Sequence, residues 1–260
     1  MPRFAYHQFL YGSDNYGVLV HDPETQLTAA IDAGDHSAYQ QALDEKGWQL
    51  SHIFITHHHG DHTEGLEALA TSTGAHVYGP SGDNPGHVHI MTQLSEGDEI
   101  AFAGEQIKVL HTPGHTLDML NFYLPTESVC FTGDTLFSLG CGRVFEGDFN
   151  MMWHSLSKLM ALPSDTIIYS SHEYTEANAK FALSVDPDNQ MLKDRAAEVA
   201  SKRAQGQPTV PSLLSEEMAT NPFLRASDSG MRAYLGMAEA TESEVFAEVR
   251  TRKDNFSSGR

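Results

Sequence analysis

Short hydrophobic runs, each broken by turn-forming residues, dominate the first 170 positions of the chain. The runs are rich in β-branched and aromatic residues and are bounded by Gly, Pro, Asp or Ser, which is typical of β-strands. We predict strands within residues 16–22, 28–34, 52–56, 75–79, 100–104, 107–112, 121–125, 129–133 and 166–171. Hairpin turns are expected within residues 102–107 and 124–129.

Two segments of this region repeat hydrophobic residues at helical spacing instead. Leu66 and Leu69 share one face of a predicted helix at residues 63–74, and a second helix is predicted at residues 148–163. Strands mixed with a few helices indicate two packed sheets with helices outside them.

From residue 173 the pattern becomes helical, because segments rich in Ala, Glu, Lys, Arg and Leu alternate with short breakers. Helices are predicted at residues 175–185, 188–206, 213–219 and 241–256. The sequence therefore predicts an α+β fold in two domains, residues 1–172 and residues 173–260.

The net charge of −19 argues against nucleic acid or an anionic membrane as a partner, since both attract clustered positive charge. Of the 16 lysines and arginines, 10 lie after residue 180, whereas all 15 histidines lie at or before His172. No hydrophobic run approaches membrane-spanning length, and the first residues do not resemble a signal peptide. We expect a cytoplasmic monomer whose two cysteines, Cys130 and Cys141, are unpaired.

The stretch FITHHHGDHTEG, residues 54–65, carries the strongest chemical signal. It follows a predicted strand, so its side chains gather on a loop at the strand's C-terminal edge. His57 and His59 alternate in H-x-H spacing, and Asp61 and His62 follow the turn at Gly60. Imidazoles and a carboxylate suit Zn, Fe or Mn. One catalytic ion needs three protein ligands, so this surplus favours two ions.

Later strands end in further candidate ligands. His115 follows the predicted strand at 107–112, Asp134 follows the strand at 129–133, and His172 follows the strand at 166–171. A second H-x-H pair, His87 and His89, lacks the downstream Asp-His and is a weaker candidate. Nucleophile-elbow, Walker A and dinucleotide-binding motifs are absent from the sequence.

THHHGDH, TPGHT, FTGDTLF and SHEYT, in this order, resemble the metal-binding signatures of the metallo-β-lactamase superfamily. GCGRVFEG and the terminal RTRKDNF narrow the resemblance to its glyoxalase II family, and the likeness covers nearly the whole chain. The resemblance implies an αββα sandwich followed by a helical domain that helps to bind glutathione. The sandwich would bind two divalent metal ions, with zinc expected ahead of iron or manganese as the metal.

The resemblance also implies a role for each matching residue. One ion would be bound by His57, His59 and His115, and the other by Asp61, His62 and His172. Asp134 would bridge the two ions, and Asp61 would take part in catalysis. The implied substrate-binding residues are Arg143, Phe145, Tyr174, Arg250 and Lys253.

The implied activity is hydrolysis of a glutathione thioester such as S-D-lactoylglutathione, a step of methylglyoxal detoxification. Four positions depart from the family pattern: Gly60, Phe145 where tyrosine is common, and Asp118 and Met119 where Gly-His is usual. A persulfide dioxygenase of the same superfamily is the closest alternative, although the basic tail disfavours it. A non-catalytic metal-binding protein is the other alternative.

Overall fold

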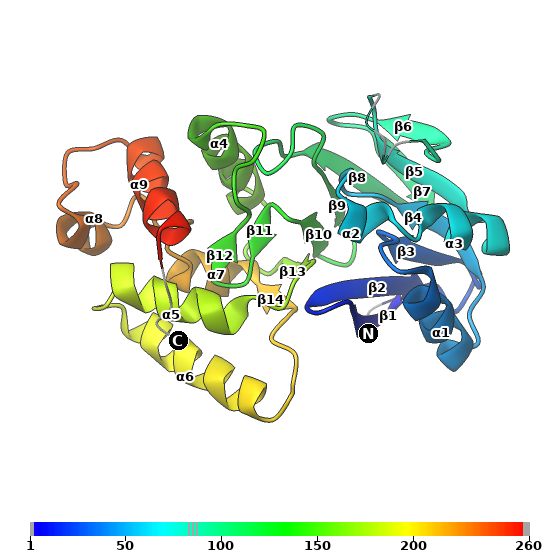
Figure 1. The fold of residues 1–260 in the computed structure, drawn as a ribbon, viewed down its shortest axis with the longest axis horizontal. Helices are drawn as coiled ribbons and strands as arrows, with labels where there is room; N and C mark the ends of the chain where they lie inside the picture. The colour runs from blue at the N-terminus through cyan, green and yellow to red at the C-terminus, as the bar shows by residue number, and fades with distance from the viewer. Residues whose placement is uncertain (1–2, 83, 85, 87, 257–260) are drawn as a thin grey trace. The chain divides into compact units, whose positions relative to one another are not determined.

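The computed structural model of the chain describes residues 3–82, 84, 86 and 88–256. The described chain divides into two compact units, whose elements are labelled in Figure 1. Unit 1 runs to His111 and resumes from Asp118 to Gly133. Unit 2 comprises Thr112–Leu117 and the chain from Asp134 onward. Each unit is described separately below.

The first sheet of unit 1 contains the strands β1 (Ala5–Tyr11), β2 (Asn15–His21), β3 (Thr28–Ile31), β4 (Leu50–Phe54), β5 (His76–Pro80) and β6 (Thr92–Leu94). They lie side by side in chain order. The first three strands pair antiparallel, and the strands from β3 to β6 pair in parallel. The C-terminal ends of the parallel strands therefore share one edge of the sheet.

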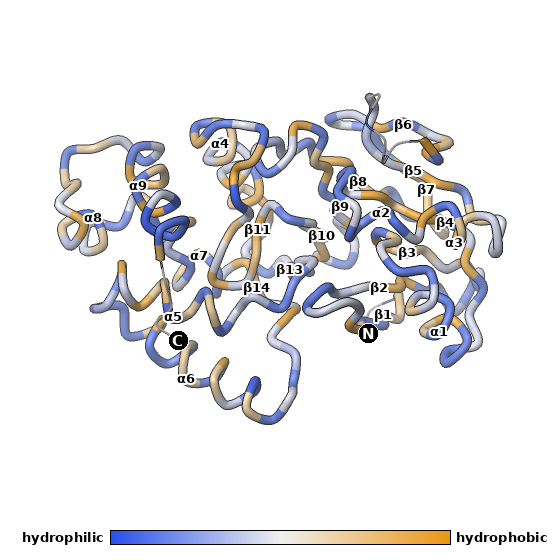
Figure 2. Tube along the Cα trace, in the orientation of Figure 1, coloured by the Kyte–Doolittle hydropathy of each residue, from blue (hydrophilic) through white to orange (hydrophobic). Residues whose placement is uncertain are grey.

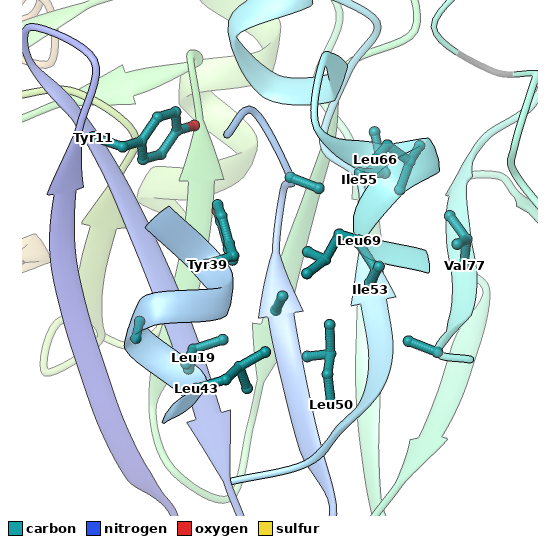
Figure 3. Packing of buried hydrophobic residues seen from close by; sticks show 14 residues of the cluster. Tyr11, Leu19, Tyr39, Leu43, Leu50, Ile53, Ile55, Leu66, Leu69 and Val77 are labelled. Atoms are coloured by element: carbon teal, nitrogen blue, oxygen red, sulfur yellow. The ribbon is translucent and has the colours of Figure 1, made fainter. Parts of the chain in front are cut away.

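Parallel neighbours need a crossover connection, and helices provide it here. The helix α1 (His36–Lys46) connects β3 to β4, and α3 (Leu66–Thr73) connects β4 to β5. Figure 3 shows both helices packed on one face of the sheet. Tyr39 and Leu43 of α1 and Leu69 of α3 join a fully buried cluster with Leu19 and Ile53 from the strands.

A second sheet of unit 1 contains β7 (Glu99–Phe102), β8 (Glu105–His111), β9 (Leu120–Leu124) and β10 (Val129–Gly133), all antiparallel. Hydrophobic residues recur along the strands of both sheets (Figure 2). Phe54 of the first sheet lies 6.1 Å from Phe102 and 5.4 Å from Phe122 of the second, measured between ring centroids. Unit 1 is therefore a sandwich whose two sheets share an aromatic interior.

Unit 2 combines two short strand pairs with helices. The strand pairs are β11 (Leu136–Phe137) with β12 (Gly140–Cys141), and β13 (Ile167–Ser170) with β14 (Ser212–Leu213). The helices are α4 (Phe149–Met160), α5 (Thr175–Val185), α6 (Gln190–Ala204), α7 (Leu214–Thr220), α8 (Ser229–Leu235) and α9 (Glu242–Asp254).

Local sequence explains where several of these helices begin. Asp148, Asn189 and Asp228 each accept a backbone N–H at the start of a helix, and Thr241 forms a capping box with Glu244 at the start of α9. Among the described residues, no helix is long and apolar enough to cross a bilayer.

The elements predicted from hydrophobic spacing are present, including both hairpins. Ala103 and Gly104 have positive φ angles of 51° and 83° in the turn between β7 and β8, as a tight hairpin turn requires. Hydrophobic spacing did not predict the one-turn helix α2 (Gly60–Thr63), the helices α1 and α8, or the strands β1, β6, β11, β12 and β14. Most of β1 is partly exposed and α1 is largely polar, so neither shows a clear hydrophobic period.

The cluster under α1 and α3 should dominate the stability of unit 1. Replacing fully buried Ile53 by Ala should lower the free energy of unfolding by about 2–5 kcal/mol, because the substitution leaves a cavity. Leu10→Ala is the matched control, since Leu10 is 53% exposed, and should change stability by less than about 0.5 kcal/mol. Urea denaturation measures both; equal losses would contradict this account of the core.

Candidate metal centre

The histidine-rich loop begins where β4 ends at Phe54. His57 is fully buried, and its Nε2 lies 3.1 Å from Nδ1 of His59. The ring of His62 lies 4.1 Å from that of His57. The loop therefore brings together three imidazoles at the shared edge of the parallel strands, as the H-x-H-x-D-H spacing predicts.

Asp32, directly after β3, holds this loop. Its carboxylate accepts hydrogen bonds from the backbone N–H of Thr56 at 2.7 Å, the Thr56 hydroxyl at 3.0 Å and Nδ1 of His62 at 2.8 Å. The same hydroxyl lies 3.0 Å from Nδ1 of His57. A histidine whose Nδ1 is engaged presents Nε2 to an ion. Both His57 and His62 are thereby set to use Nε2.

Asp32 is not among the site residues predicted above, although the sequence contains a signal for it. Asp32 follows a buried strand in TAAIDAG, just as Asp134 follows one in VCFTGD. Its backbone has a positive φ of 59°, a conformation that Asp tolerates better than most residues. Its functional importance depends on contacts to residues 56 and 62, which the local sequence does not reveal.

Two side chains from the first hairpin position Asp61. Asn15 donates to Asp61 Oδ2 at 2.9 Å, and the Tyr11 hydroxyl donates to the Asp61 carbonyl at 2.8 Å. Asp61 Oδ2 lies 3.4 Å from Nε2 of His62, and the Asp61 side chain is 48% exposed. Asp61 is thus held in orientation while solvent can reach its carboxylate. We call His57, His59, Asp61 and His62 the first donor group.

Unit 2 contains a second donor group: His115, Asp134 and His172. Asp134 Oδ2 lies 3.3 Å from Nε2 of His115, and Asp134 Oδ1 lies 3.4 Å from Nε2 of His172. All three side chains are buried. Nδ1 of His115 bonds the carbonyl of Arg143 at 2.8 Å, which again leaves Nε2 as the donor atom. The carboxylate therefore turns one oxygen toward each imidazole.

The second donor group is tightly enclosed. A Cβ atom at Gly142 would lie 2.0 Å from the Asp134 carbonyl oxygen and 3.2 Å from Nδ1 of His115, so glycine is required there. The ring of Tyr174 stacks on His172, with 4.7 Å between centroids and 2° between planes. Both contacts restrict the orientation of a donor.

The spacing within each donor group fits divalent metal ions. Zn²⁺ binds nitrogen and oxygen ligands at about 2.0–2.1 Å in tetrahedral geometry, which places neighbouring ligand atoms about 3.3 Å apart. The donor pairs described above are separated by 3.1, 3.4, 3.3 and 3.4 Å. Imidazole and carboxylate are also the ligand types that suit Zn, Fe and Mn.

Arg143 and Phe145 lie beside the second donor group in unit 2. The Arg143 guanidinium sits 5.7 Å from the centroid of the Phe145 ring, and its Nε lies 3.6 Å from Asp254 Oδ1. The Phe145 side chain is 59% exposed, and its ring lies 5.2 Å from that of His115. Arg143 therefore presents an exposed positive charge near a candidate ligand.

Arg250 and Lys253 lie on α9 and differ in environment. Buried Arg250 donates to the Cys141 carbonyl at 3.0 Å, which connects α9 to β12, and to Asp254 Oδ1 of the same helix at 2.8 Å. Lys253 donates to the Ala177 carbonyl at 3.3 Å. Burial, and then the nearby Arg250, lowers the pKa of Lys253 to about 8. A lysine of this kind loses its charge just above neutral pH.

A buried polar network, which the sequence did not predict, holds the loop at residues 137–140. Glu217 accepts the N–H of Leu139 at 2.9 Å, and Asn221 donates to two carbonyls of this loop at 3.1 and 3.0 Å. Arg195 pairs with Glu217, and both are buried. Residues of the C-terminal helices thus order the segment between Asp134 and Arg143. Their positions in helical segments gave no local signal of this role.

The second H-x-H pair shows no comparable arrangement in the described chain. His87 lies outside the described residues. His89 Nε2 lies 3.5 Å from Glu67 Oε2, and both side chains are substantially exposed. This contact fits an ordinary surface ion pair.

Both parts of the chain match known protein families. Residues 27–172 match the metallo-beta-lactamase superfamily, and residues 173–256 match the family described as hydroxyacylglutathione hydrolase C-terminus. The chain is 52% identical to hydroxyacylglutathione hydrolase of Brucella anthropi over 255 residues, covering 98% of each chain. The chain belongs to the hydroxyacylglutathione hydrolase family.

One further relative agrees with this assignment, and one solved structure shares the fold. The hydroxyacylglutathione hydrolase of Brucella ovis is 52% identical over 254 residues, covering 98% of this chain and 99% of the relative. Among solved structures, ETHE1 from Myxococcus xanthus matches with a TM-score of 0.67 and 25% identity, covering 98% of this chain and 92% of that one.

Family membership confirms the predicted fold class, a metallo-β-lactamase domain followed by a helical domain. Membership of the metallo-beta-lactamase superfamily and the two donor groups both support divalent metal binding by this hydroxyacylglutathione hydrolase family member.

Asp32→Asn tests how the first donor group is held. Asn keeps the side-chain shape and tolerates the positive φ, but it lacks the negative charge that fixes His62 and Thr56. We expect the affinity for zinc to fall by about 10–100-fold, as measured by competition with a chromophoric chelator. The control is Asp165→Asn, at an exposed position in unit 2. Affinity equal to that of the control would refute a role for Asp32.

Proposed function

We propose that this chain is a thioester hydrolase that cleaves S-(2-hydroxyacyl)glutathione, with S-D-lactoylglutathione as the expected substrate. The products are glutathione and a 2-hydroxy acid, D-lactate in this case, so the reaction serves methylglyoxal detoxification. The proposal is carried by the 52% identity to hydroxyacylglutathione hydrolase across 98% of both chains. The donor groups and the positive charges of unit 2 are consistent with it.

The two donor groups would together bind two divalent ions. The ligands proposed for one ion are His57, His59 and His115, and those proposed for the other are Asp61, His62 and His172. Asp134 would help to hold both ions, since its carboxylate lies beside His115 and His172, which are assigned to different ions. The predominance of imidazole favours zinc, although iron and manganese accept the same ligands. When bound, two such ions supply hydroxide near neutral pH and polarise the thioester carbonyl.

Asp61 would act on the attacking water. Asn15 holds its carboxylate and Tyr11 holds its backbone carbonyl, and its 48% exposed side chain leaves room for water beside it. A carboxylate in that position can orient the water and accept its proton. Glutathione departs as a thiolate. Because the pKa of its thiol is about 8.5, the leaving group needs no acid to protonate it. The chain therefore needs no serine or cysteine nucleophile.

Positive and aromatic side chains of unit 2 would bind the glutathione portion. The substrate-binding residues that we propose are Arg143, Phe145, Tyr174, Arg250 and Lys253. Arg143 is exposed, and Lys253 supplies a charge that depends on pH. Arg250 holds α9 through the Cys141 carbonyl and adds positive charge beside Lys253. Phe145 lacks a hydroxyl, so it would contribute an apolar contact.

The alternatives predict different chemistry. A persulfide dioxygenase would consume oxygen on glutathione persulfide, and a non-catalytic metal-binding protein would leave thioesters intact. The match of residues 173–256 to the hydroxyacylglutathione hydrolase C-terminus favours the hydrolase over both.

Thioester absorbance gives the direct test of the proposed reaction. The purified protein should hydrolyse S-D-lactoylglutathione, lose more than about 99% of that rate after treatment with a chelator, and recover it when zinc is restored. Undiminished hydrolysis by the metal-stripped protein, or oxygen uptake on glutathione persulfide in place of hydrolysis, would rule out the proposal.

The pH dependence of KM tests Lys253. Its lowered pKa of about 8 means that the positive charge is present below pH 8 and is lost above it. KM should therefore rise as pH increases through about 8, and Lys253→Met should raise KM at pH 7 by about tenfold with little change in kcat.

The matched control is Lys193→Met, because Lys193 is exposed on α6 of the same unit. The rise of KM near pH 8 should persist in this control and disappear in Lys253→Met. If Lys253→Met keeps the same pH profile as the unmodified protein, the proposed role of Lys253 is wrong.

A further inference from the structure

Asp118 and His58 form a polar contact beside the first donor group, within unit 1. His58 Nδ1 donates to Asp118 Oδ1 at 3.0 Å. The exposed fractions of the two side chains are 17% for His58 and 6% for Asp118. A charge-assisted hydrogen bond shielded from water is stronger than one at an open surface. This contact therefore restricts the loop more than its exposed equivalent would.

The contact extends a backbone alignment between two segments. The N–H of Leu120 donates to the carbonyl of Thr56 at 2.8 Å. The side chains of His58, two residues after Thr56, and Asp118, two residues before Leu120, also contact each other. Residues 118–120 thus approach residues 56–58 in the opposite chain direction, through one backbone contact and one side-chain contact.

Other packing gives His58 little freedom to turn elsewhere. A Cβ atom at Gly86 would lie 2.6 Å from the His58 carbonyl oxygen and 2.9 Å from its Cα, so the backbone at Gly86 lies directly against this residue. The Thr63 hydroxyl lies 3.3 Å from the same carbonyl oxygen. The Asn84 amide nitrogen lies 3.3 Å from His58 Nδ1. His58 is therefore enclosed by Asp118, Thr63, Asn84 and Gly86.

The neighbouring Met119 helps to fix Asp118. Met119 is fully buried, and its sulfur would lie 3.1 Å from a Cβ atom placed at Gly133, while Thr56 would lie 3.0 Å from it. Met119 thus packs where Thr56 of the histidine-rich loop approaches Gly133 at the end of β10. Asp118, next to it in the chain, cannot move without disturbing that packing.

We propose that Asp118 is a positioning residue that acts through His58 to fix the backbone between His57 and His59. This inference rests on the proposed function only in taking those two histidines as ligands. Because His58 lies between them, displacement of its backbone changes the angle at which both approach an ion. Asp118 contacts neither substrate nor ion in this account, and its effect is on ligand geometry.

A double-mutant cycle on metal affinity tests the proposal. The variants are Asp118→Asn, His58→Ala and the double variant, with Asp165→Asn as the exposed control. We expect either single substitution to raise the apparent Kd for zinc by about threefold to tenfold, as measured by chelator competition. The double variant should bind zinc no more weakly than the weaker-binding single variant, because both remove the same contact.

The same variants should show lower kcat for the glutathione thioester with KM within about twofold of the unmodified protein. A Kd unchanged in Asp118→Asn would overturn the proposal. So would a loss in Asp118→Asn without one in His58→Ala, since that pattern marks a direct electrostatic effect of the carboxylate. Multiplying effects in the double variant would also overturn it. Zinc affinity is read without substrate, so these results do not depend on whether thioester hydrolysis is the correct activity.

Discussion

The carboxylate of Asp32 is the interaction on which the first donor group depends. Several imidazoles gathered in a buried loop lose hydration, and each must hold one tautomer to present a lone pair to an ion. Asp32 meets both needs by accepting from Thr56 and His62, while the Thr56 hydroxyl engages His57. In unit 2 the Arg143 carbonyl orients His115 in the same manner. Hydrogen bonds to Nδ1 thus prepare Nε2 in both donor groups.

The fold makes these interactions possible because the polar side chains lie on loops directly after the ends of strands. The parallel strands β3 and β4 deliver Asp32 and the histidine loop to one edge, and the stable cluster beneath α1 keeps them there. The C-terminal helices have a different task. They order residues 137–140 through Glu217 and Asn221, and they carry the charges of Arg250 and Lys253. Unit 2 therefore contains both the second donor group and the positive charges of α9.

The sequence predicted much of this organisation because its strongest signals are local. Strands in unit 1 and helices after residue 173 follow from hydrophobic spacing, and the H-x-H-x-D-H string marks the first donor group without reference to distant residues. Asp32, Asn15 and Glu217 were missed because their roles depend on partners far along the chain. The helix α1 was missed because it buries few residues on a short face. Asp118 appeared as a departure from the family pattern, and its contact with His58 gives that departure a physical role.

Anomalous X-ray scattering from crystals of the zinc-loaded protein would locate the ions that the seven proposed ligands bind. The account predicts two zinc peaks about 3.5–4 Å apart, with Asp134 between them and ligands drawn from both donor groups. A single peak, or two zinc ions whose ligands do not include Asp134, would contradict it.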